Sequence, residues 1–365
     1  MNATGDRVDA AMAAVPQDQY VLQPDGLLLP QTTNPTLVAD MLRLLEVAPD
    51  ARVLEIGTGS GYSTALLSRL VGPTGSVTSL DVDETLVARA RCLLNEPLAE
   101  ASNVVLVAGD GRAGHPAGAP FDCLIAWATG DALPLAWAEQ MKVGGVLVAP
   151  VQVAPLGHAV AVVRARRRSG DSLVGERLIA GSFVPLSDAT PEHWAGPPPH
   201  ADVVLSAPGS GAAFPPLAEW LSGAWLRTLN GDTDSENAAR IRELCRGLSP
   251  SCLGPLHTAE DAEAFRAYLL ARLPGGLTTA FFAATGQAIG CGNPASLALL
   301  SRRGGGLVQA GDDTATRTLA RWAEDWRACG QPSFTALRPL LTRTEQGWAV
   351  RAERTAAAET QTRPS

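Results

Sequence analysis

A glycine-rich stretch near the N-terminus decides the fold: residues 52–62 read RVLEIGTGSGY. Its first part, 52–56, is a short apolar run that predicts a buried strand, and the segment 62–70 has apolar residues at helical spacing. The glycines between them permit a tight turn, and the start of the helix offers unpaired N–H groups to a ligand. We therefore predict a strand, a ligand-binding turn and a helix in direct succession.

The alternation of strands and helices continues beyond this stretch. Strands separated by helices of about ten residues indicate a parallel sheet with helices on both faces. Two antiparallel strands, at 159–166 and 172–184, are predicted to follow the alternating region. The further alternating elements are predicted strands at 76–80, 104–108, 121–127 and 146–149, and predicted helices at 84–94 and 133–141.

The chain of 365 residues is long enough for about two domains. The stretch 196–216 is rich in Pro, Gly, Ser and Ala and lacks apolar periodicity, which is typical of a linker. We predict a sheet domain at 1–195, this linker, a smaller α+β domain at 217–354 and a disordered tail at 355–365. Within the second domain, helices are predicted at 217–229, 236–247, 259–273 and 314–329, and strands at 278–284, 307–310, 335–341 and 348–352.

The composition limits the classes of partner. The chain has 29 Lys+Arg against 37 Asp+Glu, a formal net charge of -8, which argues against binding to nucleic acid or anionic membranes. The longest nearly uncharged stretch, 143–163, is interrupted by glycines and prolines, so it predicts strands rather than a membrane helix.

The cysteines and the N-terminus indicate the cellular compartment. The six cysteines form no C-x-x-C pair and have no histidines at zinc spacing, so we expect reduced thiols and no metal site. No signal-peptide pattern occurs at the N-terminus, and we therefore expect a cytoplasmic protein.

Three carboxylates are predicted at the ends of successive strands. The turn has the spacing E-x-G-x-G-x-G instead of the G-x-G-x-x-G of dinucleotide enzymes, and Glu55 would repel a pyrophosphate but suits an amine. Asp81 closes the second strand, where a carboxylate can accept both ribose hydroxyls, and Asp110 closes the third, where it can accept from an adenine amino group. Acids for an amine, a ribose and an adenine indicate S-adenosyl-L-methionine.

Residues 53–62, VLEIGTGSGY, resemble the first motif of the protein-L-isoaspartate O-methyltransferases. The resemblance continues through 103–104, 109–111, 121–122, 141–145 and 183–186, and covers roughly residues 6 to 188. It implies a doubly wound, mostly parallel seven-stranded Rossmann-like sheet, and methyl transfer from S-adenosyl-L-methionine to a side-chain carboxyl. The residues expected at the cofactor are Glu55, Gly57, Thr58, Gly59, Gly61, Tyr62, Asp81, Val82, Asp110 and Gly111.

The chain departs from that family upstream of the first strand. The family usually has Q-T-I-S-x-P, with the serine hydroxyl near the transferred methyl group, whereas residues 29–35 here read LPQTTNP. Aligning the prolines places Thr33 on the serine, and aligning the Gln-Thr pair places Asn34 there. We favour the first alignment and take Thr33, Thr32 and Asn34 as candidate catalytic residues. The alternative is that Thr32 and Thr33 form an ordinary helix cap.

Two aromatic side chains are candidates for binding substrate. Trp127 ends the fourth strand beside the expected substrate crevice, although a core tryptophan is an equal alternative. His115 follows the Asp110 turn and is a candidate to face the same crevice, although a histidine in a loop is more often a surface residue.

The C-terminal half suggests a specialised substrate. Long forms of this family resemble enzymes associated with ribosomally synthesised peptides such as lanthipeptides and lasso peptides, where an aspartate is methylated and converted to aspartimide or isoaspartate. We therefore expect a carboxyl methyltransferase that acts on aspartyl or isoaspartyl residues of a precursor or lasso peptide. The alternatives are a general isoaspartyl repair enzyme and, from another class, a non-catalytic binding protein with a methyltransferase fold.

Overall fold

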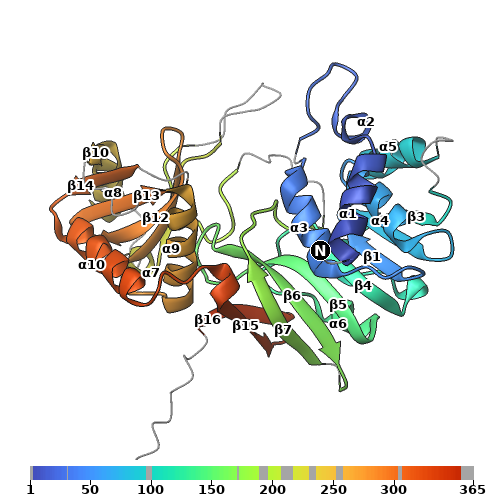
Figure 1. Cartoon of the computed structure of the whole chain (residues 1–365). Helices are drawn as coiled ribbons and strands as arrows, with labels where there is room; N and C mark the ends of the chain where they lie inside the picture. The colour runs from blue at the N-terminus through green and yellow to red at the C-terminus, as the bar shows by residue number, and fades with distance from the viewer. Residues whose placement is uncertain are drawn as a thin grey trace, which may run out of the picture. The chain divides into compact units, whose positions relative to one another are not determined.

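The computed structural model divides into two compact units, each of which has its own sheet (Figure 1). It describes residues 3–30, 32–95, 101–170, 172–188, 196–206, 217–229, 236–251, 258–302 and 306–354. The first unit comprises Met1–Gln152, Val160–Glu192 and Leu340–Val350, and the second comprises Val153–Ala159, His193–Pro339 and Arg351–Ser365. The predicted tail and the second part of the predicted linker, 207–216, lie outside the described residues, and the predicted domain limits stay a prediction.

A seven-stranded sheet in the order β3-β2-β1-β4-β5-β6-β7 forms the centre of the first unit. β1 to β5 pair in parallel, and β6 is antiparallel to both β5 and β7. The predicted α/β class and the mostly parallel, doubly wound Rossmann-like sheet are thereby confirmed. The strands are β1 (Arg52–Ile56), β2 (Ser76–Asp81), β3 (Val104–Ala108), β4 (Phe121–Ala126), β5 (Met141–Gln152), β6 (Val160–Arg168) and β7 (Ser172–Ile179).

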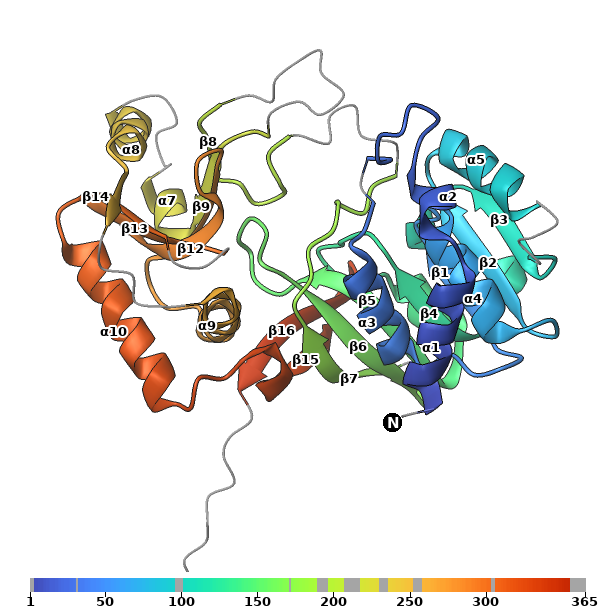
Figure 2. The same ribbon diagram turned by 45° about the horizontal axis from the view of Figure 1, so that its top comes forward.

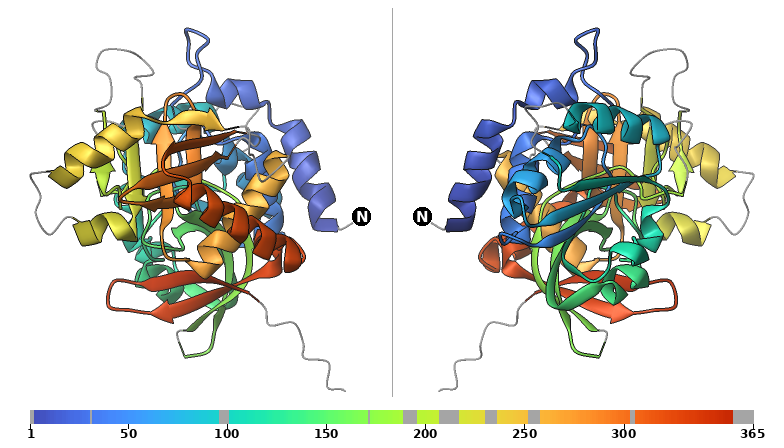
Figure 3. Two further views of the ribbon diagram at one scale, coloured as in Figure 1. Left: turned by 90° about the vertical axis from the view of Figure 1, so that its left-hand side faces the viewer. Right: turned by 90° about the vertical axis from the view of Figure 1, so that its right-hand side faces the viewer.

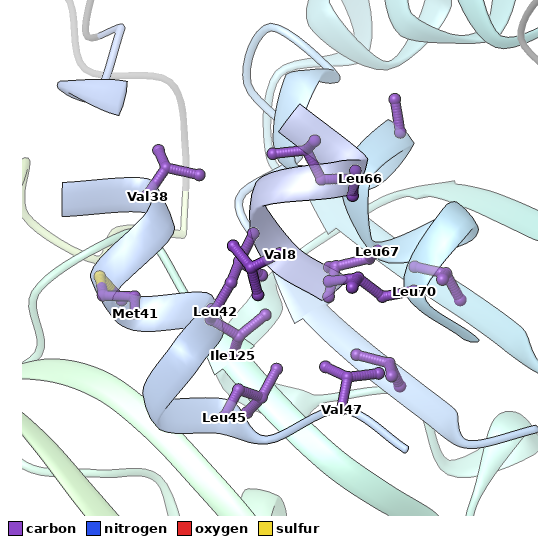
Figure 4. Packing of buried hydrophobic residues seen from close by; sticks show 14 of the residues in the cluster. Val8, Val38, Met41, Leu42, Leu45, Val47, Leu66, Leu67, Leu70 and Ile125 are labelled. Atoms are coloured by element: carbon purple, nitrogen blue, oxygen red, sulfur yellow. The ribbon is translucent and has the colours of Figure 1, made fainter. Parts of the chain in front are cut away.

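Helices α1, α3 and α4 cover one face of this sheet (Figure 2). In α3, Val38, Met41, Leu42 and Leu45 are buried at a spacing of three or four residues, which places them on one side of the helix. Val8 of α1, Leu42 and Ile125 of β4 pack in one cluster (Figure 4). The helices of this unit are α1 (Ala3–Ala14), α2 (Gln17–Val21), α3 (Pro35–Leu45), α4 (Tyr62–Val71), α5 (Glu84–Leu94) and α6 (Leu135–Glu139), with 3-10 turns η1 (Gly111–Ala113) and η2 (Pro116–Gly118).

The second unit has an antiparallel sheet in the order β10-β14-β13-β12-β11-β9-β8, which confirms the predicted second α+β domain. Its strands are β8 (Val203–Val204), β9 (Trp220–Gly223), β10 (Ser249–Ser251), β11 (Leu277–Phe282), β12 (Gly286–Asn293), β13 (Ser296–Ser301) and β14 (Leu307–Gly311). Its helices are α7 (Ala224–Leu229), α8 (Glu236–Arg246), α9 (Ala259–Arg272) and α10 (Thr314–Ala328), with a 3-10 turn η3 (Phe334–Ala336).

A two-stranded hairpin, drawn in red in Figure 3, follows the second sheet. It consists of β15 (Leu337–Arg343) and β16 (Trp348–Arg354), and its central residues Leu340–Val350 belong to the first unit. The chain therefore returns to the first unit after it has formed the second sheet.

Several predicted elements differ from the structure. The predicted helix at 217–229 is wrong in its first half, because Trp220–Gly223 is strand β9, paired with β8 and β11. The ladder satisfies the backbone of this buried segment, and that tertiary pairing outweighs its helical periodicity. The predicted strand at 172–184 ends at Ile179, and the predicted helix at 133–141 is shortened to α6 because β5 already begins at Met141.

The described residues contain neither a membrane-spanning helix nor a cluster of metal-binding side chains, and their cysteines are unpaired. No helix in this part of the chain is long and apolar enough to cross a membrane. No group of three or more His, Cys, Asp or Glu side chains within it is arranged to hold a metal ion. Cys252 lies outside the described residues, and the other cysteines, which are Cys92, Cys123, Cys245, Cys291 and Cys329, are free thiols.

Candidate functional site

The turn between β1 and α4 is fixed to the end of β2. The N–H groups of Gly57 and Thr58 donate to the carbonyl oxygen of Leu80 at 2.7 and 3.2 Å. The hydroxyls of Thr58 and Ser79 form a buried hydrogen bond of 2.7 Å. The glycine-rich turn is therefore a fixed structure at the carboxyl ends of β1 and β2, where open α/β sheets bind ligands.

Two glycines of this turn serve different purposes. Gly59 has a φ of 51°, and a Cβ added to it would meet no atom within 4 Å, so its backbone borders open space. Gly61 has a φ of 84°, and a Cβ added there would lie 3.2 Å from the Cβ of Ala90 in α5. Gly59 thus leaves room for a ligand, whereas Gly61 permits close packing of α5 on the turn.

Glu55 lies underneath the turn and has no exposed surface. Its Oε1 accepts hydrogen bonds from the Ser63 hydroxyl at 2.5 Å and the Trp127 Nε1–H at 2.9 Å, and its Oε2 accepts one from Thr64 at 2.5 Å. Burial raises the pKa of Glu55, and the hydroxyl donors of Ser63 and Thr64 act in the opposite direction. In this arrangement Glu55 anchors α4 and Trp127, and a direct role at the cofactor amine stays a prediction.

Asp81 lies at the end of β2 and faces the turn. Its Oδ2 accepts the Gly59 N–H at 2.8 Å and its Oδ1 accepts the Asp83 N–H at 3.0 Å. Burial raises the pKa of this half-buried carboxyl. Val82 follows it and is also half-buried. The structure thus brings together Asp81 and Gly59, which are both predicted cofactor residues, and their contact with the cofactor stays a prediction.

Asp110 lies beyond β3 and is paired with an arginine. Arg112 donates its backbone N–H and its guanidinium to Asp110 at 2.8–3.0 Å, and it also forms an ion pair with Asp188 at 3.0 Å. Hydrogen bonds from Arg112 lower the pKa of Asp110. At Gly111, an added Cβ would lie 2.4 Å from Ile56 Cγ2, so this turn packs directly against the end of β1.

The segment before α3 separates the three candidate catalytic residues. Asn34 caps α3, since its Oδ1 accepts the Thr36 N–H at 2.8 Å, and Pro35 occupies the first turn. The Thr32 hydroxyl donates to Leu29 O at 2.6 Å. The alternative that Thr32 and Thr33 form the cap is therefore wrong, because Asn34 fills that position. The Thr33 hydroxyl makes no hydrogen bond within the described residues, which do not include Gln31.

Trp127 belongs to the core of the first unit. It is 8% exposed, its ring lies 6.2 Å from that of Phe183, and a Cβ at Gly57 would lie 3.3 Å from its own Cβ. Its indole is thus held between the turn and the segment after β7. Any contact of Trp127 with substrate stays a prediction.

His115 is half-buried at the start of η2. Its N–H donates to Gln140 Oε1 at 2.7 Å. Gln140 Nε2 in turn donates to Ala113 O at 2.8 Å, so a side chain beside β5 holds this turn. A substrate role for His115 stays a prediction.

Arg89 was not singled out by the sequence. From α5 it donates to Ser60 O of the glycine turn at 3.2 Å and to Leu22 O at 2.9 Å, just after α2. The rings of Tyr20 in α2 and Tyr62 at the start of α4 lie 6.2 Å apart. An arginine bound to backbone carbonyls leaves no sequence motif, so no pattern could have identified this link.

The fold and the glycine turn are those of a Rossmann-like methyltransferase. Residues 2–191, more than half of the chain, match the family described as "Protein-L-isoaspartate(D-aspartate) O-methyltransferase (PCMT)". The chain therefore belongs to this family of protein carboxyl O-methyltransferases. S-adenosyl-L-methionine is the methyl donor of the family.

Relatives with this name each match about half of the chain's length. The protein-L-isoaspartate O-methyltransferase of Leptothrix cholodnii is 43% identical over 167 residues, 44% of this chain and 56% of that protein. That of Anaeromyxobacter dehalogenans is 38% identical over 188 residues, 51% of this chain and 87% of that protein. The chain thus spans little more than half of the Leptothrix relative and most of the Anaeromyxobacter one.

A solved structure from Plasmodium falciparum, named a "putative protein-L-isoaspartate O-methyltransferase" in complex with S-adenosyl-L-homocysteine, is 19% identical and has a TM-score of 0.43. It covers 50% of this chain, and this chain covers 90% of it. Another structure named protein-L-isoaspartate O-methyltransferase is 17% identical, with a TM-score of 0.48, over 97% of this chain and 96% of its own.

Proposed function

We propose that this protein transfers a methyl group from S-adenosyl-L-methionine to the side-chain carboxylate of an aspartyl or isoaspartyl residue in a peptide or protein. The observation that carries the proposal is the fixed glycine turn, with Asp81 bound to Gly59, in a chain of this family. The relatives' names support the isoaspartyl acceptor.

The residues at the strand ends fit the cofactor. Gly59 borders open space, so a ligand can approach its backbone without meeting a side chain. Asp81 is half-buried beside it, and carboxylate oxygens have free lone pairs for ribose hydroxyls even while accepting backbone N–H groups. Asp110 would accept from the adenine amino group, and Glu55 would support the turn from below.

The reaction asks for positioning rather than proton transfer. Bound S-adenosyl-L-methionine supplies an electrophilic methyl group on a positively charged sulfur. The acceptor carboxylate is ionised near pH 7, so no general base is needed. The chain must align the carboxylate oxygen with the methyl carbon and exclude water. The Thr33 hydroxyl, which has no hydrogen bond within the described residues, would donate to that carboxylate and orient it.

The methyl ester then reacts without further help from the chain. The next backbone nitrogen attacks the ester carbonyl, methanol leaves, and a succinimide closes. This sequence accounts for either aspartimide formation or conversion between aspartyl and isoaspartyl linkages.

The substrate we favour is a ribosomally synthesised peptide. The second unit supports this choice, because it adds a seven-stranded sheet with helices to a family match that ends at residue 191. Such a unit suits recognition of a dedicated peptide. General isoaspartyl repair is the second candidate, favoured by the names of the relatives.

A paired mass-spectrometric assay tests both candidates. Purified protein and S-adenosyl-L-methionine are incubated with a generic isoaspartyl peptide and, separately, with any precursor peptide encoded beside the gene. A gain of one methyl group followed by loss of methanol on the precursor alone supports tailoring. Methylation of the generic peptide supports repair. Methylation of neither, with S-adenosyl-L-homocysteine still bound in calorimetry, contradicts the proposed acceptor.

A further inference from the structure

The loop at 128–134, which follows β4, is held by segments distant in sequence. The Thr129 N–H donates to Val184 O at 2.7 Å, and Thr129 O accepts the Leu186 N–H at 2.7 Å. The Gln152 N–H donates to Gly130 O at 3.0 Å. The segment after β7 and the end of β5 therefore fix the first half of the loop.

The hairpin β15–β16 holds the second half of the same loop. The Leu133 N–H donates to Trp348 O at 2.9 Å, and the Trp348 N–H donates to Leu133 O at 2.8 Å. This is a reciprocal antiparallel bridge, with Trp348 only 7% exposed. The bridge joins residues more than 200 positions apart within the first unit.

The turn of the hairpin requires a glycine at its contact with the loop. Gly347 has a φ of 145°, and an added Cβ would lie 2.5 Å from Leu133 O and 3.1 Å from the Cβ of Ala132. The turn is closed by Thr344, whose N–H and hydroxyl both donate to Gly347 O at 2.8 Å. A side chain at Gly347 would therefore push the loop or open the bridge.

The braced loop starts at the candidate site. Strand order reverses between β1 and β4, and ligands of open α/β sheets bind at this reversal. Trp127, at the start of the loop, donates its N–H to Ile56 O at 2.9 Å and its indole N–H to Glu55. The glycine turn and Asp81 lie on the β2 side of β1, so the loop after β4 borders the opposite side, where the acceptor would enter.

We propose that the β15–β16 turn is a positioning element for the acceptor peptide. Gly347 and Trp348 hold the 128–134 loop as one wall of the substrate crevice, and neither residue touches the reacting atoms. The inference rests on the proposed function for the identity of the acceptor, and the bracing itself rests on the bridge and on the space around Gly347. The part of the chain beyond the family match thus contributes to acceptor binding through the loop that it holds.

Substitution of Gly347 tests the proposal. Gly347→Ala should raise KM for the acceptor peptide roughly tenfold, since a displacement of about 1 Å at a site can cost up to 100-fold in rate. The affinity for S-adenosyl-L-homocysteine in calorimetry should stay unchanged. Hydrogen exchange followed by mass spectrometry should become faster in 128–134. The milder variant Thr344→Val, which removes a hydrogen bond from the exposed side of the turn without adding bulk at the bridge, should act in the same direction with a smaller effect.

Gly330→Ala is the matched control. Gly330 has a φ of 79° and no atom within 4 Å of an added Cβ, so the variant also places an alanine at a positive φ but makes no clash at the loop. Unchanged exchange in 128–134 for both test variants would overturn the bracing. Faster exchange with an unchanged KM would overturn the role at the acceptor. An inactive wild-type protein that still shows the exchange difference would overturn the proposed function and, with it, the acceptor role.

Discussion

Replacing Glu55 by alanine removes the acceptor of three buried or half-buried donors. The hydroxyls of Ser63 and Thr64, each at 2.5 Å, can rotate toward other acceptors, but the Trp127 indole N–H at 2.9 Å is fixed by its packed ring. A buried donor left unsatisfied costs about 1–3 kcal/mol. The cavity left by the side chain adds roughly 2 kcal/mol. We expect Glu55→Ala to lower the free energy of unfolding by about 3–5 kcal/mol.

The isosteric variant Glu55→Gln separates charge from shape. It keeps an oxygen for Trp127 and leaves Thr64, a hydroxyl that can also accept, facing the amide nitrogen. Its loss of stability should therefore be smaller, about 1–2 kcal/mol near pH 5. Because burial raises the pKa of Glu55 in the folded state, the wild-type carboxyl contributes stability below its unfolded pKa and loses it as pH rises through the folded pKa. The deficit of Glu55→Gln should consequently shrink with increasing pH.

Urea unfolding of the wild type and both variants between pH 4.5 and 8 measures these differences. The signal is far-UV circular dichroism, and the two units are fitted as separate transitions because a chain of this kind need not unfold in one step. A loss below about 1 kcal/mol for Glu55→Ala would refute the account of the buried donors. A deficit of Glu55→Gln that widens as pH rises would refute the assigned direction of the pKa shift.

Substitutions at four other residues probe the rest of the site. Thr33→Val should lower kcat for methyl transfer by about 10–100-fold while Thr33→Ser retains it, because a hydrogen bond to a charged group contributes about 1.5–3 kcal/mol. Asn34→Ala should instead lower the free energy of unfolding by about 1 kcal/mol through loss of the helix cap. A larger loss of kcat in Asn34→Ala than in Thr33→Val would assign the catalytic position to Asn34. Asp81→Asn should weaken binding of S-adenosyl-L-homocysteine by about tenfold or more in calorimetry, and unchanged affinity would exclude Asp81 from the cofactor site. Arg112→Gln should raise the pKa of Asp110, since Arg112 lowers it in the wild type, so cofactor affinity should be lost at a higher pH in the variant than in the wild type; identical pH profiles would contradict this pairing.

Several elements of the first sheet could be predicted because local sequence signals mark where they begin and end. Strand β1, helix α5 and strand β3 have the predicted bounds, since glycine-rich turns and apolar periodicity mark them without reference to the rest of the chain. The strands of the second sheet were harder to predict from the sequence, because some of them contain glycines. Strand β12 contains Gly290 and Gly292, which favour a turn in the sequence, yet both permit close approach in the structure. An added Cβ at Gly290 would lie 1.9 Å from Ala298 O, and one at Gly292 would lie 2.6 Å from the Trp225 ring.

The sequence predicted where the site residues lie better than it predicted which side chains they contact. The pairing of Asp81 with the glycine turn follows from two adjacent parallel strands ending at one edge. The burial of Glu55 depends on Trp127, which lies 72 positions further along the chain. The Leu133–Trp348 bridge joins two segments without a recognisable sequence motif, so it could be identified only from the folded structure. Contacts between residues so far apart produce no periodic pattern in the sequence, so they cannot be predicted from it.

The return of the chain to its first unit has a consequence for synthesis on the ribosome. The N-terminal part of that unit ends at Glu192, and Leu340 follows about 150 residues later. At a translation rate of about 5–20 residues per second, roughly 8–30 s separate the emergence of the two parts. During that interval the second sheet is made while Leu133 still lacks its partner on β16. The nascent protein therefore acquires its complete first unit only after most of the second unit has been synthesised.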